Sequence, residues 1–152
     1  MKKVWPFLLI VLLILIDQAS KYWALGHLTD EYAKTLCSVL DLRLALNHGV
    51  AFSLFYSKGI QTPMLLVGLT SILSLFVFYL LIYSRDNRHA FAYALILGGA
   101  LANIIDRVRL GAVVDFIDAH IATYHWPIFN LADSFICIGA FILIVYAHGS
   151  KN

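Results

Sequence analysis

Three aspartates lie within one short stretch of an otherwise weakly charged chain. The stretch "AVVDFIDAHIATYHWPIFNLADSF" carries Asp115, Asp118 and Asp133, although only 13% of all residues are charged. An acid in apolar surroundings is costly unless it is neutralised, paired or used in a reaction. If Asp115 and Asp133 meet in space, both cannot ionise cheaply, so they share a proton. One of them then takes a proton from water while the other donates to a carbonyl oxygen, which is the chemistry of aspartic peptidases.

Simpler interpretations of these acids stay open. Asn130 and Asp133 have the spacing of a helix N-cap and its third residue, which is close to a capping box. Asp118 alone is an acid in a solvated loop. Asp115 is harder to explain in this way, because it lies inside the apolar run "VVDFI" with no neighbouring base.

Five further polar residues lie in apolar segments. Asp17 and Lys21 are spaced i, i+4, which favours a structural ion pair on one helix face. Asn103, Asp106 and Arg107 also share a helix face, where they predict a hydrogen-bond network between helices. Arg107 is expected to clamp Asp106 through two parallel hydrogen bonds. We expect these residues to support a site rather than to perform the chemistry.

Metal and nucleophile chemistry receive little support from the sequence. His120 and His125 with Asp115 and Asp118 are an alternative ligand set, but their spacing matches no strong zinc pattern, and HExxH is absent. No serine stands in a GxSxG elbow. We therefore expect neither a metal nor another cofactor.

The composition indicates an integral membrane protein. The chain has 152 residues, is 61% hydrophobic and has a mean hydropathy of +0.82. Its length predicts a single domain, residues 1–152. A net charge of +2 without a basic patch argues against nucleic acid as a partner.

The expected fold class is an all-α membrane protein with four transmembrane helices and a small extracytoplasmic β-sheet. A span needs about 20 mostly apolar residues. The runs that satisfy this cover about 4–24, 62–83, 89–108 and 130–147. The first run has no cleavage site and is expected to be retained. The small residues Gly98, Gly99, Ala100 and Ala102 allow close helix contact in lipid.

The β element is expected at about residues 36–56. In "VLDLRLALN" leucines alternate with other residues, which is the period of a strand. Asn47-His48-Gly49 breaks this pattern, and "VAFSLF" is expected to return as a second strand. Such a sheet would rest on the outer membrane surface. After Gly111 ends the third span, "AVVDF" is expected to be extended.

The candidate site residues converge on one membrane face. Four spans put both termini on one side, where short loops carry an excess of lysine and arginine, so we place the termini in the cytoplasm. The polar residues then gather at the opposite, outer face: Asp17, Lys21, Asn47, Asn103, Asp106, Arg107, Asp115, Asn130 and Asp133. A transporter or proton-relay subunit and an assembly factor with purely structural acids are the rival interpretations.

Five motifs together resemble the lipoprotein signal peptidases, or signal peptidase II family. They are "DQASK" at 17–21, "NHGVAF" at 47–52, "GGALANIIDR" at 98–107, "VVDFID" at 113–118 and "FNLADS" at 129–134. The resemblance covers nearly the whole chain. Ala102 departs from it, since a glycine is common before the asparagine, but the residue stays small.

The resemblance implies a bacterial inner-membrane aspartyl endopeptidase. Such an enzyme removes signal peptides from prolipoproteins by cutting just before a diacylglyceryl-modified cysteine. By motif, the catalytic pair falls on Asp115 and Asp133, and the other polar residues named above surround the site. The partners implied are lipidated prolipoproteins, membrane lipid and the cyclic peptide inhibitor globomycin.

The predicted sheet offers a way to hold such a substrate. Strand-type contacts from residues 36–56 would bind an extended peptide. Asn47, at the turn, would then donate to the substrate backbone.

Overall fold

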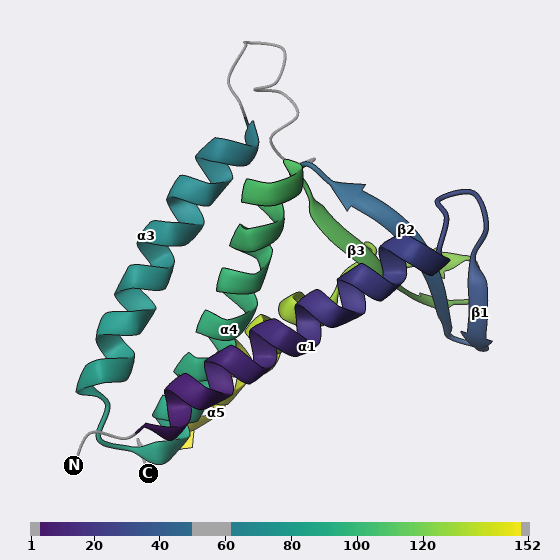
Figure 1. Cartoon of the computed structure of the whole chain (residues 1–152). Coiled ribbons are helices and arrows are strands. Elements are labelled where there is room, and N and C mark those ends of the chain that lie inside the picture. The colour runs from purple at the N-terminus through teal and green to yellow at the C-terminus, as the bar shows by residue number, and fades with distance from the viewer. Residues whose placement is uncertain (1–3, 50–61, 150–152) are drawn as a thin grey trace.

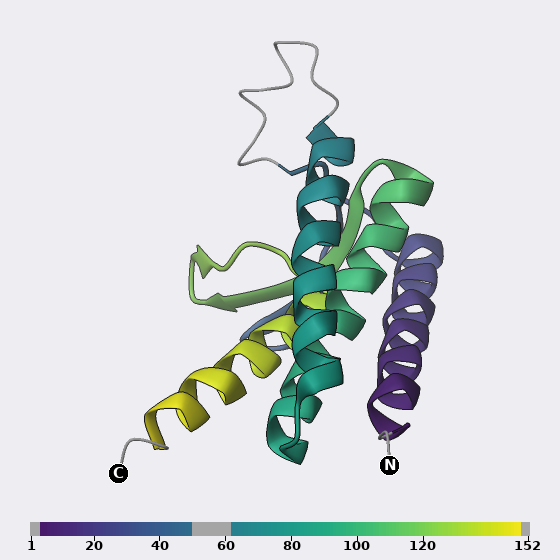
Figure 2. The same ribbon diagram turned by 90° about the vertical axis from the view of Figure 1, so that its left-hand side faces the viewer.

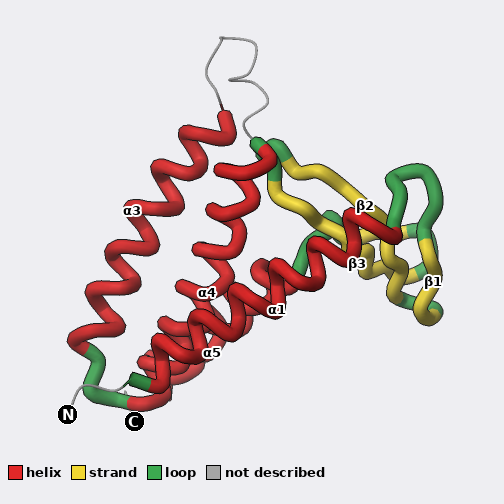
Figure 3. The backbone as a smooth tube through the Cα atoms, in the orientation of Figure 1, coloured by secondary structure: helices red, strands yellow, loops and turns green. Residues whose placement is uncertain are grey.

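The computed structural model describes residues 4–49 and 62–149, which form four helices and one sheet (Figure 1). The helices are α1 (Trp5–His27), α3 (Thr62–Tyr83), α4 (Asn87–Leu110) and α5 (Leu131–Gly149). The strands are β1 (Lys34–Cys37), β2 (Leu40–Asn47), β3 (Val113–Ile121) and β4 (Tyr124–His125). Helix α4 contacts each of the other three helices. The strands gather at the end of the molecule where α1 and α4 finish, away from the first turn of α1 (Figure 3).

The four predicted apolar runs are all helical, and three of the helices are long and apolar enough to cross a membrane. These are α1, the Met64–Tyr83 part of α3, and α4. The apolar stretch of α5, Leu131–Tyr146, is shorter. The prediction of a mostly helical membrane fold is therefore confirmed, while the length criterion identifies three spans in the described chain rather than four.

Helices α4 and α5 pack with their backbones in close contact. A Cβ atom on Gly99 would lie 2.3 Å from the Ala132 carbonyl oxygen of α5, and one on Gly139 would lie 2.7 Å from the Ala92 carbonyl oxygen. Both distances are too short for any side chain. The prediction of close helix contact at the small residues of α4 is confirmed, and this contact places the start of α5 beside α4.

Gly99→Ala is expected to destabilise the fold by about 1–3 kcal/mol, because the new methyl group meets backbone that cannot move aside. Thermal unfolding in detergent measures this. Gly68→Ala in α3 is the matched control, since a Cβ there meets nothing within 4 Å. Equal stability of the two variants would contradict the close α4–α5 packing.

The sheet is antiparallel and has the order β1-β2-β3-β4. Strand β2 confirms the predicted strand, although burial does not alternate along it and Leu46 is exposed. The described part of its sheet reaches well beyond residues 36–56. Its partner is β3, more than sixty residues further on, with Ala45 opposite Asp115 and Asp41 opposite Asp118. The prediction of the sheet's extent was incomplete because strand pairing over such a distance leaves no local signal. The expected strand at 50–55 lies outside the described residues.

Two local features position β3. Gly111 ends α4 with φ 72°, and its N–H donates to the Arg107 carbonyl oxygen at 3.1 Å, as expected for a glycine cap. The chain then turns into β3, whose Phe116 packs against Ala24 and Leu28 at the end of α1. This packing holds Asp115 at the junction of sheet and helices.

Candidate active site

Asp115 is buried and held by two amide groups. Its side chain lies on β3 and the residue is 2% exposed. Asn130 donates its Nδ2 to Asp115 Oδ1 at 2.6 Å, and Asn47 donates its Nδ2 to Oδ2 at 3.1 Å. Each carboxylate oxygen therefore has one donor, and the plane of the carboxyl group is set by residues from two other elements.

Asp133 lies in the first turn of α5 and belongs to the same network. Asn103 donates its Nδ2 to Asp133 Oδ1 at 2.8 Å. The Asn130 N–H donates to Asp133 Oδ2 at 3.3 Å, while the Asp133 N–H donates to Asn130 Oδ1 at 2.9 Å. This reciprocal pair is a capping box, as the spacing suggested. Asn130 also binds Asp115, so one asparagine bridges the two carboxyl groups.

The electrostatic environment separates Asp115 from an ordinary surface acid. Burial raises the pKa of Asp115 from 3.8 to about 6; the hydrogen bond from Asn47 opposes this rise, and the charge of Asp133 adds to it. The Arg107 guanidinium interacts electrostatically with Asp133 and Asp115. The charge of Asp133 therefore acts on Asp115, as expected for two acids in one network.

Lys21 is the centre of a second set of contacts beneath the acids. Its Nζ lies 2.8 Å from Asp17 Oδ2, 2.7 Å from Asp106 Oδ2 and 2.8 Å from Asn103 Oδ1. The predicted Asp17–Lys21 ion pair is confirmed. Because Lys21 occupies the oxygen of the Asn103 amide, the amide nitrogen faces Asp133. The buried lysine thus orients a group that binds the candidate dyad.

The two acids beside Lys21 join four elements, namely α1, α4, α5 and β3. Asp17 Oδ1 accepts the Ala132 N–H of α5 at 2.8 Å. Asp106 accepts from Gln18 Nε2 at 2.8 Å and from the Val114 N–H of β3 at 3.3 Å. Sequence reasoning missed Gln18, although it stands inside the "DQASK" motif.

The comparisons with known proteins agree on one family. The model of the family described as signal peptidase (SPase) II matches residues 9–148. The chain belongs to the signal peptidase II family. It is similar to the lipoprotein signal peptidase of Ralstonia nicotianae, with 44% identity over 136 residues, 89% of this chain and 79% of that protein. It is also similar to that of Francisella tularensis subsp. novicida, with 40% identity over 149 residues, 96% of this chain and 92% of that protein.

Two solved structures have the same fold as this signal peptidase II family member. One, described as a bacterial membrane enzyme at 2.3 Å resolution, has a TM-score of 0.85 and 28% identity and covers all of this chain and 94% of its own. Another, at 1.9 Å, has a TM-score of 0.82 and 31% identity over 93% of this chain and 91% of its own. The architecture of helices and sheet is therefore that of a membrane enzyme.

Two predictions for this signal peptidase II chain were wrong in detail. Arg107 does not clamp Asp106, because Lys21 and Gln18 from α1 bind that carboxylate, and Arg107 Nε has no hydrogen-bond partner among the described residues. Asp118 is not a solvated loop acid. It is 1% exposed on β3, with His125 Nδ1 at 2.8 Å and Arg43 Nη2 at 3.7 Å.

The histidines of the family member's sheet are engaged with acids in separate pairs. His125 binds Asp118, and His120 Nε2 lies 3.4 Å from Asp41 Oδ2. Within residues 4–49 and 62–149, no group of three or more histidine, cysteine or acidic side chains has the arrangement of a metal site.

Proposed function

We propose that the chain is an intramembrane aspartyl endopeptidase that removes the signal peptide of diacylglyceryl-modified prolipoproteins just before the lipidated cysteine. Membership of the signal peptidase II family supports the reaction and the class of substrate. The observation that carries the catalytic assignment is the Asn130 bridge, which binds Asp115 with its amide nitrogen and the Asp133 N–H with its amide oxygen.

In this mechanism the Asp115–Asp133 pair holds one proton. The ionised member takes a proton from water as the water oxygen attacks the scissile carbonyl carbon, and the protonated member donates to the carbonyl oxygen. The tetrahedral intermediate then collapses, the C–N bond breaks, and a proton from the pair passes to the leaving amine. Burial favours the proton on Asp115. The titration nevertheless belongs to the pair.

Cleavage is expected to slow as the pH rises through about 6, the pKa to which burial raises Asp115. Above that value the pair loses its shared proton, so kcat/KM should fall about tenfold per pH unit. The folded chain should also become less stable as the pH rises. Because folding raises the pKa of Asp115, the contribution of this residue to the free energy of unfolding is fully present below pH 3.8 and is lost as the pH rises through about 6. Initial rates between pH 5 and 8 with a lipidated precursor test this, and a flat profile would contradict it.

We propose that Asn47 donates a hydrogen bond to the substrate backbone in addition to its contact with Asp115. Its Nδ2 donates to Asp115 Oδ2, and its Oδ1 accepts the Gly49 N–H at 2.9 Å, which fixes the amide at the end of β2. Asn47→Ala should weaken turnover by about tenfold, since a hydrogen bond to a charged group contributes about 1.5–3 kcal/mol. Steady-state kinetics measure the effect, and unchanged kinetics would contradict the role.

The proposed setting is the bacterial inner membrane. We propose one domain with four spans, both termini in the cytoplasm and the acids at the outer face. A lipid anchor on the substrate cysteine would hold the scissile bond at that depth. Asp17, Lys21, Asn103, Asp106, Arg107 and Asn130 are proposed as support or substrate-binding residues. Globomycin is proposed to occupy the same groove.

Purified protein in micelles, given matched lipidated and unlipidated precursors, tests the proposed function. Mass spectrometry should show cleavage just before the cysteine in the lipidated precursor only. Cleavage of neither precursor, with the protein properly folded, would refute it and leave the transporter and assembly-factor alternatives. A transporter would spread polar groups through the membrane depth, whereas the described residues of α3 have no charged side chain.

A further inference from the structure

The end of the β3–β4 hairpin, after Asp118, differs in charge from the rest of the sheet. From residue 119 to residue 132 the sequence "AHIATYHWPIFNLA" contains no aspartate, glutamate, lysine or arginine. The segment that contains β1 and β2, residues 28–49, carries three acidic and two basic side chains. The end of the hairpin therefore lacks the charged side chains that favour contact with water.

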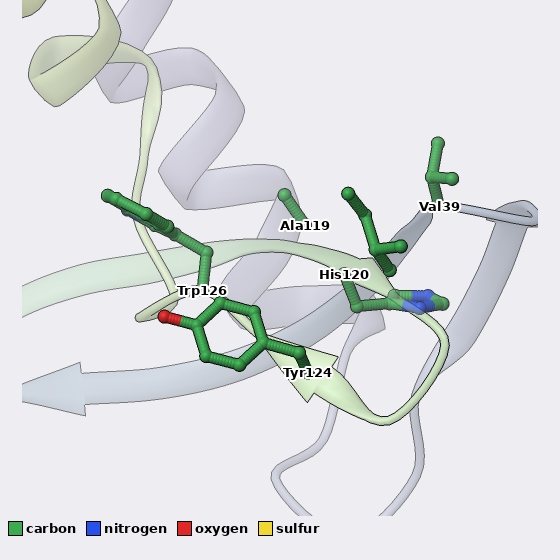
Figure 4. Close-up of a pocket in the computed structure, with 6 residues that line it drawn as sticks. Val39, Ala119, His120, Tyr124 and Trp126 are labelled. Atoms are coloured by element: carbon green, nitrogen blue, oxygen red, sulfur yellow. The ribbon is translucent and has the colours of Figure 1, made fainter.

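One face of the hairpin is apolar and exposed. Ile121 pairs with Tyr124 across the turn, and the Trp126 N–H donates to the Ala119 carbonyl oxygen at 2.8 Å, which places these side chains on one face. Ile121 is 76% exposed, Tyr124 69% and Trp126 59%. With Val39, Ala119 and His120 they line an open pocket of about 520 Å³, in which the Tyr124 and Trp126 rings lie along the hairpin and His120 lies on the side away from them (Figure 4).

The opposite face of the hairpin is polar. The His120 and His125 rings stack with their centroids 4.9 Å apart, and in Figure 4 the His120 ring points away from the aromatic rings. These histidines bind Asp41 and Asp118, and Arg43 approaches Asp118. The hairpin is therefore amphipathic across its thickness, with histidine and aspartate side chains on one face and large apolar side chains on the other.

The position of the hairpin matches a lipid boundary. Figure 2 shows the hairpin projecting sideways from the helices, on the side toward which α5 runs. It lies near the level where α5 begins, below the start of α3 and the end of α4. Tyrosine and tryptophan are enriched where protein meets the membrane–water interface. Exposed apolar patches of this kind mark interaction surfaces.

We propose that one face of the hairpin, the interfacial face, inserts into the lipid–water boundary on the side of the membrane where the sheet lies. This face is formed by Val39, Ile121, Tyr124 and Trp126. The polar face then keeps its contacts with Asp41 and Arg43 of β2, away from the lipid. The occupant of the pocket is lipid, namely the glycerol and upper acyl region of a phospholipid. This proposal goes beyond the proposed function, and its test uses no activity, so either can fail without the other.

The test uses the fluorescence of Trp126. Trp5→Phe and Trp23→Phe leave Trp126 as the remaining tryptophan of the three in the chain. The full chain is reconstituted in phosphatidylethanolamine and phosphatidylglycerol vesicles, with and without phosphatidylcholine brominated near the glycerol end of one acyl chain. The proposal predicts a blue-shifted emission and loss of most of it to the bromines. An unquenched emission at the wavelength of tryptophan in water would overturn the proposal. An emission that shifts to the blue only after a precursor peptide is added would overturn it as well.

The matched control moves the fluorophore to the charged loop between α1 and β1. Tyr32→Trp, with all three native tryptophans replaced by phenylalanine, reports from a position that is 76% exposed beside Glu31. Its emission should stay unquenched, and equal quenching at both positions would overturn the proposal. Ile121→Asp with Tyr124→Asp should relieve the quenching of Trp126 while the chain stays in the vesicles. Unchanged quenching there would also overturn it.

Discussion

Asp115→Asn and Asp133→Asn are each expected to abolish cleavage of a lipidated precursor, with kcat at least about a thousandfold lower. Each substitution keeps the shape of the side chain but removes a carboxyl group that must hold or release a proton. General acid–base groups contribute about 10²–10⁴-fold in rate, and here each acid serves in both directions. Single-turnover cleavage followed by mass spectrometry measures the loss.

Asp118→Asn is the matched control for this pair. Asp118 lies on the same strand as Asp115 and is equally buried, but its carboxylate binds His125 and Arg43 instead of the amide network. Its loss should lower stability and leave kcat near the parent value. If all three variants insert normally and lose activity alike, the assignment of Asp115 and Asp133 as the dyad is wrong. If the first two fail to insert, their acids serve the scaffold instead.

Lys21→Met is expected to lower the free energy of unfolding by about 3–5 kcal/mol, the usual cost of leaving buried charges without their partner. Lys21 is 2% exposed, and its Nζ lies within 2.8 Å of the carboxylates of Asp17 and Asp106. Cleavage should fall as well, because the Asn103 amide that faces Asp133 loses the donor that orients it. Thermal unfolding in detergent and single-turnover rates measure both effects.

Two further variants test whether the loss of stability comes from the buried charges around Lys21. Arg109→Met removes an exposed cation whose guanidinium donates to Gln18 at 3.3 Å, and it should change stability by less than about 0.5 kcal/mol. Combining Lys21→Met with Asp17→Asn and Asp106→Asn should recover most of the lost stability, because no uncompensated charge remains. A Lys21→Met chain as stable as the parent would show that the buried cluster does not hold the helices together.

The sequence predicted the features that depend on neighbouring residues. The Asp17–Lys21 pair follows from helix geometry, the glycine cap from the conformation that Gly111 adopts, and the Asn130–Asp133 box from residue spacing. The apolar runs predicted the helices because their length and composition carry that information. The catalytic roles remain predictions.

The features that depend on distant residues were not predictable in the same way. Nothing in "VVDFID" indicates that β2 will pair with it and bury Asp118. Arg107 stands next to Asp106 in sequence, yet Lys21, from a helix more than eighty residues away, lies 2.7 Å from that carboxylate. Contacts of this kind depend on which helices pack together. The local residue pattern of a single sequence does not indicate that arrangement.

Infrared titration of the carboxyl groups tests the central claim most directly, because it observes the shared proton itself. Difference spectra of the parent chain in vesicles should contain a protonated carboxyl band that disappears as the pH rises through about 6, the pKa of Asp115. The band should be missing in Asp115→Asn, unchanged in Asp118→Asn and moved to lower pH in Asp133→Asn, where the neighbouring charge is gone. A band that survives Asp115→Asn, or that titrates identically with and without the Asp133 carboxylate, would contradict a coupled pair.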